Sequence, residues 1–223
     1  MAKRRLCLLA MSLCVFVVSA SSGVAHASRE SQPVSIAKAR SLPLGTLVTV
    51  EGVVTVPPGA FKSSLSDEGF AIQDSSGGVY VRASTRTDLP LRRRVRVTGK
   101  LVDSNGLLTI VPDGTASISA LGRRQVVRPR LIKTGKLGET TEGLLLRVRG
   151  TVTRAVVDDP PYGFRLFLND GTGEVQIYVS TSTGITQRGL ETGARLEVTG
   201  FGGQYKDHYE VNPRLPVDIR LLP

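Results

Sequence analysis

The chain has little of the chemistry from which most enzyme active sites are built. Its 223 residues include two cysteines, two histidines and no tryptophan. Cys7, Cys14 and His26 lie within the first 27 residues, so His208 is the one histidine of the remaining sequence. That remaining sequence has no thiol for a disulfide, a zinc site or a cysteine nucleophile. We therefore expect no enzyme activity, no bound metal and no cofactor.

The first 27 residues have the pattern of a cleaved export signal. Basic residues at positions 3–5 precede an apolar run at 6–20, and an Ala-His-Ala cleavage motif ends at Ala27. A membrane anchor needs roughly 18–20 apolar residues, and here polar residues begin at position 21. We predict a signal peptide over residues 1–27 and an exported mature chain, periplasmic or extracellular, with no membrane span.

The same series of short motifs occurs twice in the remaining sequence. Residues 45–55 are matched by 143–153 at an offset of 98, 74–79 by 170–175 at 96, and 95–99 by 196–200 at 101. A period near one hundred residues is typical of a small domain and too long for a solenoid repeat. We predict one domain over residues 33–122, a basic connector over 123–136 and a second domain over 137–223.

Each copy has five segments of alternating apolar residues separated by turns rich in Gly, Asp and Ser. The segments are 47–54, 70–73, 79–82, 94–99 and 107–111 in the first copy, and 145–153, 165–169, 174–179, 195–200 and 209–211 in the second. Such alternation predicts antiparallel strands. Gly52 and Gly150, inside the first strand of each copy, indicate a bulge or a sharp bend. Residues 35–40 and 130–133 each predict one helical turn.

Five short strands leave open edges unless the sheet closes on itself. A small Greek-key barrel removes those edges. The predicted fold class is therefore all-β, with two tandem five-stranded Greek-key barrels of the OB type after a cleaved signal peptide.

The motifs of the first copy resemble those of a bacterial family of exported OB-fold domains. The resemblance rests on residues 45–55, on Gly-Phe-Ala-Ile-Gln-Asp at 69–74 with Val-Tyr-Val at 79–81, and on Val-Arg-Val-Thr-Gly at 95–99. It covers residues 33–122 and 129–222. These domains are similar to nucleic-acid-binding OB modules that accompany extracellular nucleases, and similar domains occur in the outer parts of sensor proteins. The resemblance implies an accessory binding domain.

Positive charge is concentrated in the first copy and the connector. Residues 35–122 have ten Lys and Arg against seven Asp and Glu, residues 123–136 have six against none, and residues 137–223 have nine against eleven. Clustered basic residues attract polyanions such as nucleic acid, anionic lipid or acidic glycans, although Lys and Arg also keep a domain soluble.

The candidate binding residues lie on the strands and loops with which OB folds bind ligands. Single-stranded nucleic acid needs cations along its backbone and rings on which bases stack. Alternation directs Phe70, Ile72, Val79 and Val81 inward in the first copy, and Leu166, Leu168, Val175, Ile177 and Val179 in the second. The candidates are Phe61, Lys62, Tyr80, Arg82, Arg94 and Arg96 in the first copy and Arg165, Phe167, Tyr178, Tyr205 and Lys206 in the second. Outward rings on strands are also common for packing reasons alone.

Two functions fit these features. The first is a secreted, non-enzymatic protein whose tandem barrels bind nucleic acid, namely single-stranded or extracellular DNA. Two linked weak sites, one on each barrel, would give avidity. The alternative is an envelope module that recognises a protein or an oligosaccharide, which the acidic second copy favours. The sequence favours nucleic acid, because the duplicated barrel, the basic connector and the outward Tyr and Arg positions occur together.

Overall fold

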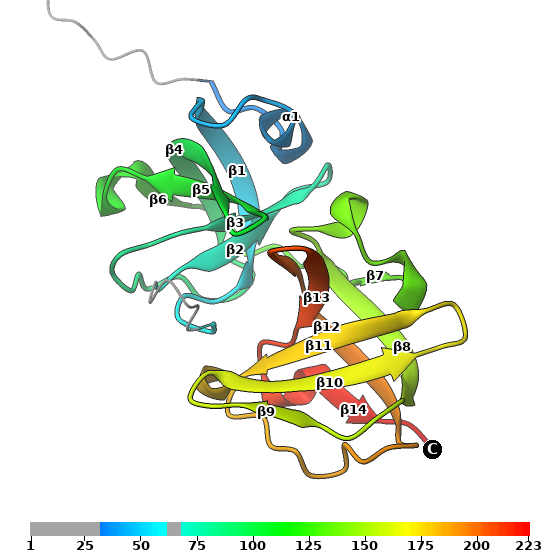
Figure 1. Cartoon of the computed structure of the whole chain (residues 1–223). Helices are drawn as coiled ribbons and strands as arrows, with labels where there is room; N and C mark the ends of the chain where they lie inside the picture. Colours follow the sequence, from blue (N-terminus) through cyan, green and yellow to red (C-terminus); the bar gives the residue numbers. More distant parts are fainter. Residues whose placement is uncertain (1–31, 62–67) are drawn as a thin grey trace, which may run out of the picture. The chain divides into compact units, whose positions relative to one another are not determined.

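The computed structural model describes residues 32–61 and 68–223 (Figure 1). The predicted signal peptide and the candidate Lys62 lie outside the described residues. Within these two stretches, no helix is both long enough and apolar enough to cross a bilayer.

The first barrel is built from five strands that close on themselves. The strands are β1 (Leu47–Val56), β2 (Phe70–Gln73), β3 (Gly78–Val81), β4 (Arg94–Ser104) and β5 (Leu107–Pro112). They pair in the order β1-β2-β3-β5-β4, and β4 pairs again with β1. β3 and β5 are parallel, whereas the other neighbours are antiparallel. A short strand, β6 (Ile118–Leu121), pairs with β4 outside this circuit.

The second barrel repeats this order. Its strands are β8 (Leu145–Val152), β10 (Gly163–Asn169), β11 (Glu174–Ser180), β12 (Arg195–Tyr205) and β13 (His208–Asn212). They pair in the order β8-β10-β11-β13-β12, and β12 closes the circuit to β8. Three short strands lie outside it, namely β7 (Arg130–Leu131), β9 (Val157–Asp159) and β14 (Ile219–Leu221). The predicted fold class, two five-stranded OB-type barrels, is confirmed.

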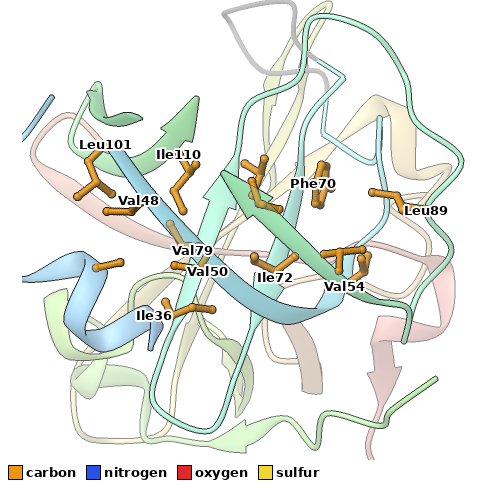
Figure 2. Packing of buried hydrophobic residues seen from close by; sticks show 14 residues of the cluster. Ile36, Val48, Val50, Val54, Phe70, Ile72, Val79, Leu89, Leu101 and Ile110 are labelled. Atoms are coloured by element: carbon orange, nitrogen blue, oxygen red, sulfur yellow. The ribbon is translucent and has the colours of Figure 1, made fainter. Parts of the chain in front are cut away.

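The core of the first barrel is made of the side chains that alternation directs inward. Phe70, Ile72 and Val81 are fully buried and Val79 is 1% exposed. Figure 2 shows Phe70, Ile72 and Val79 packed with valines of β1 and with Ile36, which comes from α1 (Ile36–Arg40); the valines are Val48, Val50 and Val54. The inward residues predicted for the second barrel all belong to its core as well. Alternation succeeds here because each strand has one face in the barrel interior.

Gly52 and Gly150 lie where another strand crosses closely over the first strand of each barrel. A Cβ on Gly52 would lie 3.1 Å from Ile72 Cβ, and one on Gly150 would lie 3.0 Å from the backbone of Asn169. In β1 the register shift itself falls between Val54 and Val56. The two glycines are therefore sites of close strand approach.

Of the two predicted helical turns, one is confirmed and one is wrong. α1 follows Ser35, whose side chain accepts a hydrogen bond from Lys38 N at 3.3 Å. Residues 130–133 do not form a turn, because Arg130–Leu131 pairs with the open side of β8 as β7 and Ile132 N donates to Arg147 O at 3.0 Å. A 3₁₀ turn follows at Thr134–Lys136. The connector thus contributes to the second sheet, and the domain boundaries stay predictions.

Hydrogen bonds also join the two barrels. Arg214 Nη1 donates to Thr55 O at 2.6 Å, and Leu145 N donates to Gln73 Oε1 at 2.8 Å. These bonds link backbone groups at the edge of one barrel to side chains of the other.

Candidate binding cleft

A cleft of about 450 Å³ is lined by residues of both barrels. The first barrel contributes β3, β5 and the hairpin between β4 and β5, and the second contributes the outer faces of β10 to β13. Six of the candidate site residues line it, namely Phe61, Tyr80, Arg82, Arg165, Tyr178 and Tyr205. The structure therefore brings candidates from both copies into one cavity.

Phe201 forms the apolar centre of the cleft. Its ring centroid lies 6.2 Å from that of Phe61 and 6.0 Å from that of Tyr80. Phe201 is 2% exposed and Tyr80 is 6% exposed. Tyr80 points out of its own barrel as alternation predicts, but Phe201 covers it. The expectation that Tyr80 is an accessible stacking surface is wrong, because the barrels bury it between them.

Phe201 is absent from the predicted candidates, because the fourth strand of the second copy was predicted to end at residue 200. β12 runs on to Tyr205, and this extension places Phe201 beside the first barrel. The signal in the sequence was the apolar residue itself, which continues the strand beyond Gly200. The same part of β12, beyond residue 200, also places Gly203 and Gln204 in the cleft lining.

Two tyrosine rings at the cleft are accessible to a ligand. Tyr205 is 38% exposed and Tyr162 is 50% exposed. The His208 ring meets the Tyr205 ring edge-on, with centroids 5.9 Å apart, and Lys206 Nζ lies 5.2 Å from the Tyr205 centroid. A cation beside a flat ring suits both a phosphate and a stacked base. Lys206 itself is outside the cleft lining.

Arg165 and Tyr178 are held by one carboxylate. Arg165 Nη2 lies 3.0 Å from Asp159 Oδ1, and Tyr178 OH donates to Asp159 Oδ2 at 3.1 Å. Burial, and then the bond to Asp159, raise the pKa of the Tyr178 hydroxyl well above its ordinary value, so the hydroxyl keeps its proton. Arg82 lines the cleft and pairs with no carboxylate of the described residues.

A second carboxylate, Glu210, lies on the outer face of β13. Its Oε2 accepts from Gln176 Nε2 at 2.8 Å and its Oε1 accepts from Asn212 Nδ2 at 2.9 Å. Burial raises the pKa of this carboxyl, whereas the bonds from Asn212 and Gln176 act in the opposite direction. His208 Nε2 lies 3.8 Å from Oε2. Glu210, Gln176 and Asn212 are absent from the candidates predicted from the sequence.

Arg94, Arg96 and Phe167 do not line the cleft. Arg94 Nη2 and Arg96 Nη2 lie 2.7 and 2.8 Å from the two carboxylate oxygens of Glu51. The Arg154 guanidinium carbon lies 3.6 Å from the Phe167 ring centroid. These three side chains contact Glu51 and Arg154, which do not line the cleft either. Within residues 32–61 and 68–223, no cluster of three or more His, Cys, Asp or Glu is placed to hold a metal ion.

The closed strand order defines the chain as a tandem OB-barrel protein. No protein-family model and no curated protein matches it. Among solved structures it is similar to the OB domain of a Methanosarcina mazei protein, with 19% identity, coverage of 43% of this chain and 86% of that chain, and a TM-score of 0.37. It is also similar to a murine DNA binding protein bound with double-stranded DNA, with 12% identity, coverage of 78% and 96%, and a TM-score of 0.41.

Proposed function

We propose that this chain is an exported, non-enzymatic protein that binds single-stranded nucleic acid in the cleft between its two barrels. The observation that carries the proposal is the convergence on one cavity of accessible rings from the second copy and of arginines from both copies. Tyr162 and Tyr205 offer exposed rings, and Arg82 offers positive charge at the same cavity, where Arg165 is paired with Asp159.

The size and walls of the cleft suit nucleotides rather than a duplex. A volume of about 450 Å³ is within the range of small-ligand sites. Bases that stack on tyrosines must be unpaired, because a duplex hides their faces. A single strand satisfies this requirement without the free energy of base-pair opening.

The cleft also changes the expected number of sites. Two separate weak sites, one on each barrel, would each need accessible rings of their own. Tyr80, the ring of the first barrel's sheet, is instead buried against Phe201. One composite site, built jointly by both copies, therefore takes the place of two linked sites.

A salt-titrated binding screen tests the proposal. Fluorescence anisotropy with labelled single-stranded DNA, duplex DNA, RNA and an acidic polysaccharide is expected to show tightest binding to a single strand. Binding is expected to weaken as salt rises, because each neutralised phosphate releases counterions. Absence of binding to every oligonucleotide at low salt by a folded protein would falsify the proposal.

An envelope oligosaccharide or protein is the second candidate ligand. Asp159 and Glu210 in the cleft favour it, because carboxylates repel phosphates and accept hydrogen bonds from sugar hydroxyls or peptide amides. Partners captured from envelope extract distinguish the two. Retention that survives nuclease and high salt supports the alternative, whereas loss of every partner after nuclease supports nucleic acid.

A further inference from the structure

Glu210 is a mostly buried carboxylate that lines the cleft. Its side chain is 12% exposed and lies between Gln176 of β11 and Gly203 of β12 in the ladder. Both neighbours line the same cavity. A carboxylate at this depth adds nothing to the attraction of phosphates, so its role in a nucleic-acid site needs another explanation.

The hydrogen bonds of Glu210 leave acceptor capacity on both oxygens. Each oxygen accepts one bond from a side-chain amide, Gln176 at Oε2 and Asn212 at Oε1. An ionised carboxylate has about four lone-pair sites in total, two on each oxygen. The two amides hold the carboxylate in one orientation and leave each oxygen able to accept one more N–H.

The neighbouring glycine keeps the floor of the cleft open beside this carboxylate. A Cβ on Gly203 would lie 2.6 Å from Asn212 Oδ1 and 3.6 Å from the Phe201 ring. A side chain there would displace the amide that orients Glu210. A glycine inside a strand often marks a site where a ligand approaches the backbone closely.

We propose that the cleft selects guanine, whose Watson–Crick edge donates N1–H and N2–H to the two oxygens of Glu210. Guanine is the common base that presents two adjacent N–H donors on this edge. Adenine and cytosine offer one amino group each, and thymine offers one ring N–H. A base in this position lies within the same cavity as the accessible Tyr205 ring, on which it stacks.

This inference rests on the proposed function and gives the acidic residue a part in it. Arg82 neutralises a phosphate of the strand at the wall formed by the first barrel, while Glu210 contacts a base edge. In this arrangement the phosphates lie away from Glu210, so its carboxylate does not repel them.

The test uses four labelled 12-mers of deoxythymidine that carry guanine, hypoxanthine, adenine or cytosine at one central position, with unsubstituted oligothymidine as the reference. We expect the guanine oligomer to bind about tenfold more tightly than the reference, as for other two-bond contacts. Hypoxanthine has N1–H but lacks the N2 amino group, so it is expected to lose most of this gain.

Glu210→Gln tests the carboxylate directly, because the amide has a single accepting oxygen. The variant is expected to lose the guanine preference, measured as the ratio of its affinities for the guanine oligomer and for oligothymidine. Glu191→Gln, a change of the same kind at an exposed position outside the cleft, is the matched control and should keep the preference. If Glu210→Gln does not fold, guanosine and inosine 5′-monophosphates are compared by the shift each gives in the wild-type Tm, and guanosine is expected to give the larger shift.

Equal affinity for all five oligomers would overturn the base selection and leave nucleic-acid binding in place. The same holds if Glu210→Gln keeps the preference, or if the two monophosphates give equal shifts. Failure of every oligomer to bind overturns the selection and the proposed function together. Binding of an oligosaccharide alone assigns the cleft to the other ligand class.

Discussion

The carboxylate of Asp74 accepts a hydrogen bond from the backbone amide of Ile36 at 2.9 Å, and this bond ties the first turn of α1 to the β2–β3 turn. The same carboxylate accepts from Ser76 N and Gly77 N through its other oxygen. The second barrel uses Asp170 in the same way, because its Oδ1 accepts from Thr134 Oγ1 at 2.8 Å. In each barrel, therefore, the Asp of this turn is hydrogen-bonded to the segment that precedes the barrel.

Asp74→Asn is expected to lower the free energy of unfolding at pH 7 by about 1–2 kcal/mol, since one accepting oxygen becomes a donor. Burial opposes the ionisation of Asp74, but the bonds from Ile36, Ser76 and Gly77 outweigh it and hold its pKa below the ordinary 3.8. This stabilisation is present above the unfolded-state pKa and is lost as the pH falls through the lower folded-state value. Urea unfolding at pH 7 and pH 3 checks it. The difference between the wild type and the variant should shrink at pH 3, and Asp113→Asn, on an exposed carboxylate, should behave as the wild type does.

Arg40→Ala is expected to destabilise the protein by about 3 kcal/mol at pH 7, because it leaves a buried carboxylate without its cation. Arg40 Nη2 lies 2.9 Å from Glu142 Oε1, and the Glu142 side chain is 1% exposed. Burial raises the pKa of Glu142, and Arg40 opposes this rise. In the Arg40→Ala variant the pKa of Glu142 should therefore rise further.

A raised folded-state pKa means that ionised Glu142 costs stability above that pKa and that the cost is removed as the pH falls through it. Unfolding of wild type and Arg40→Ala at pH 7 and pH 5 should therefore give a smaller difference at the lower pH. Adding Glu142→Gln to Arg40→Ala should restore part of the lost stability. An equal loss at both pH values would contradict this account of Glu142.

Tyr80→Ala is expected to lower stability, whereas Tyr205→Ala is expected to weaken binding. Tyr80 is 6% exposed against Phe201, so its loss should lower the unfolding free energy by about 3 kcal/mol. Tyr205 is 38% exposed, so its loss should leave stability unchanged and weaken single-strand binding by about 1–3 kcal/mol. Thermal unfolding and anisotropy measure the two effects. Phe167→Ala, a ring outside the cleft, is the control for binding and should retain wild-type affinity.

Arg82→Gln is expected to reduce the slope of log affinity against log salt by about 1, as the loss of one phosphate contact does. Arg94→Gln should leave the slope unchanged, because Arg94 pairs with Glu51 at 2.7 Å and lies away from the cleft. Both substitutions remove one positive charge, so the comparison separates a local contact from net charge. An equal fall in slope for both would show that position does not matter.

Gly78→Ala is expected to lower the Tm markedly, because Gly78 and Gly143 of the other barrel meet backbone to backbone. A Cβ on Gly78 would overlap the carbonyl of Gly143. Gly122→Ala is the matched control, since a Cβ there meets no atom within 4 Å. Calorimetry of the two variants measures the effect, and equal Tm values would argue against close contact of Gly78 with Gly143.

The barrels followed from the sequence because their cause is local and repeated. Val79 and Val81 alternate with Tyr80 and Arg82, and one face of a strand in a barrel is always interior. The turns that begin at Asp74 and Asp170 separate corresponding strands in the two copies. The helical turn predicted at residues 130–133 was wrong, because Arg130 and Leu131 pair with β8 instead. That pairing depends on a sheet edge that exists only in the folded protein.

The cleft could be predicted only in part. The pattern of rings and arginines selected Phe61, Tyr80, Arg82, Arg165, Tyr178 and Tyr205, all of which line it. It did not select Phe201, Glu210 or Asn212, and it had no means to tell that Arg94 and Arg96 are paired with Glu51. Whether a side chain points out of its barrel depends on its own strand. Whether that side chain is accessible depends on the part of the other barrel that lies against it.

The amino-acid sequence was sufficient for two barrels and their cores, because alternation and turn residues act within a few positions of the chain. Tertiary structure decided that Phe201 of one barrel buries Tyr80 of the other and that Glu210 faces the same cleft as Arg82. Residues about a hundred positions apart meet there, and contacts between separate sheets leave no periodic trace in the sequence of either one.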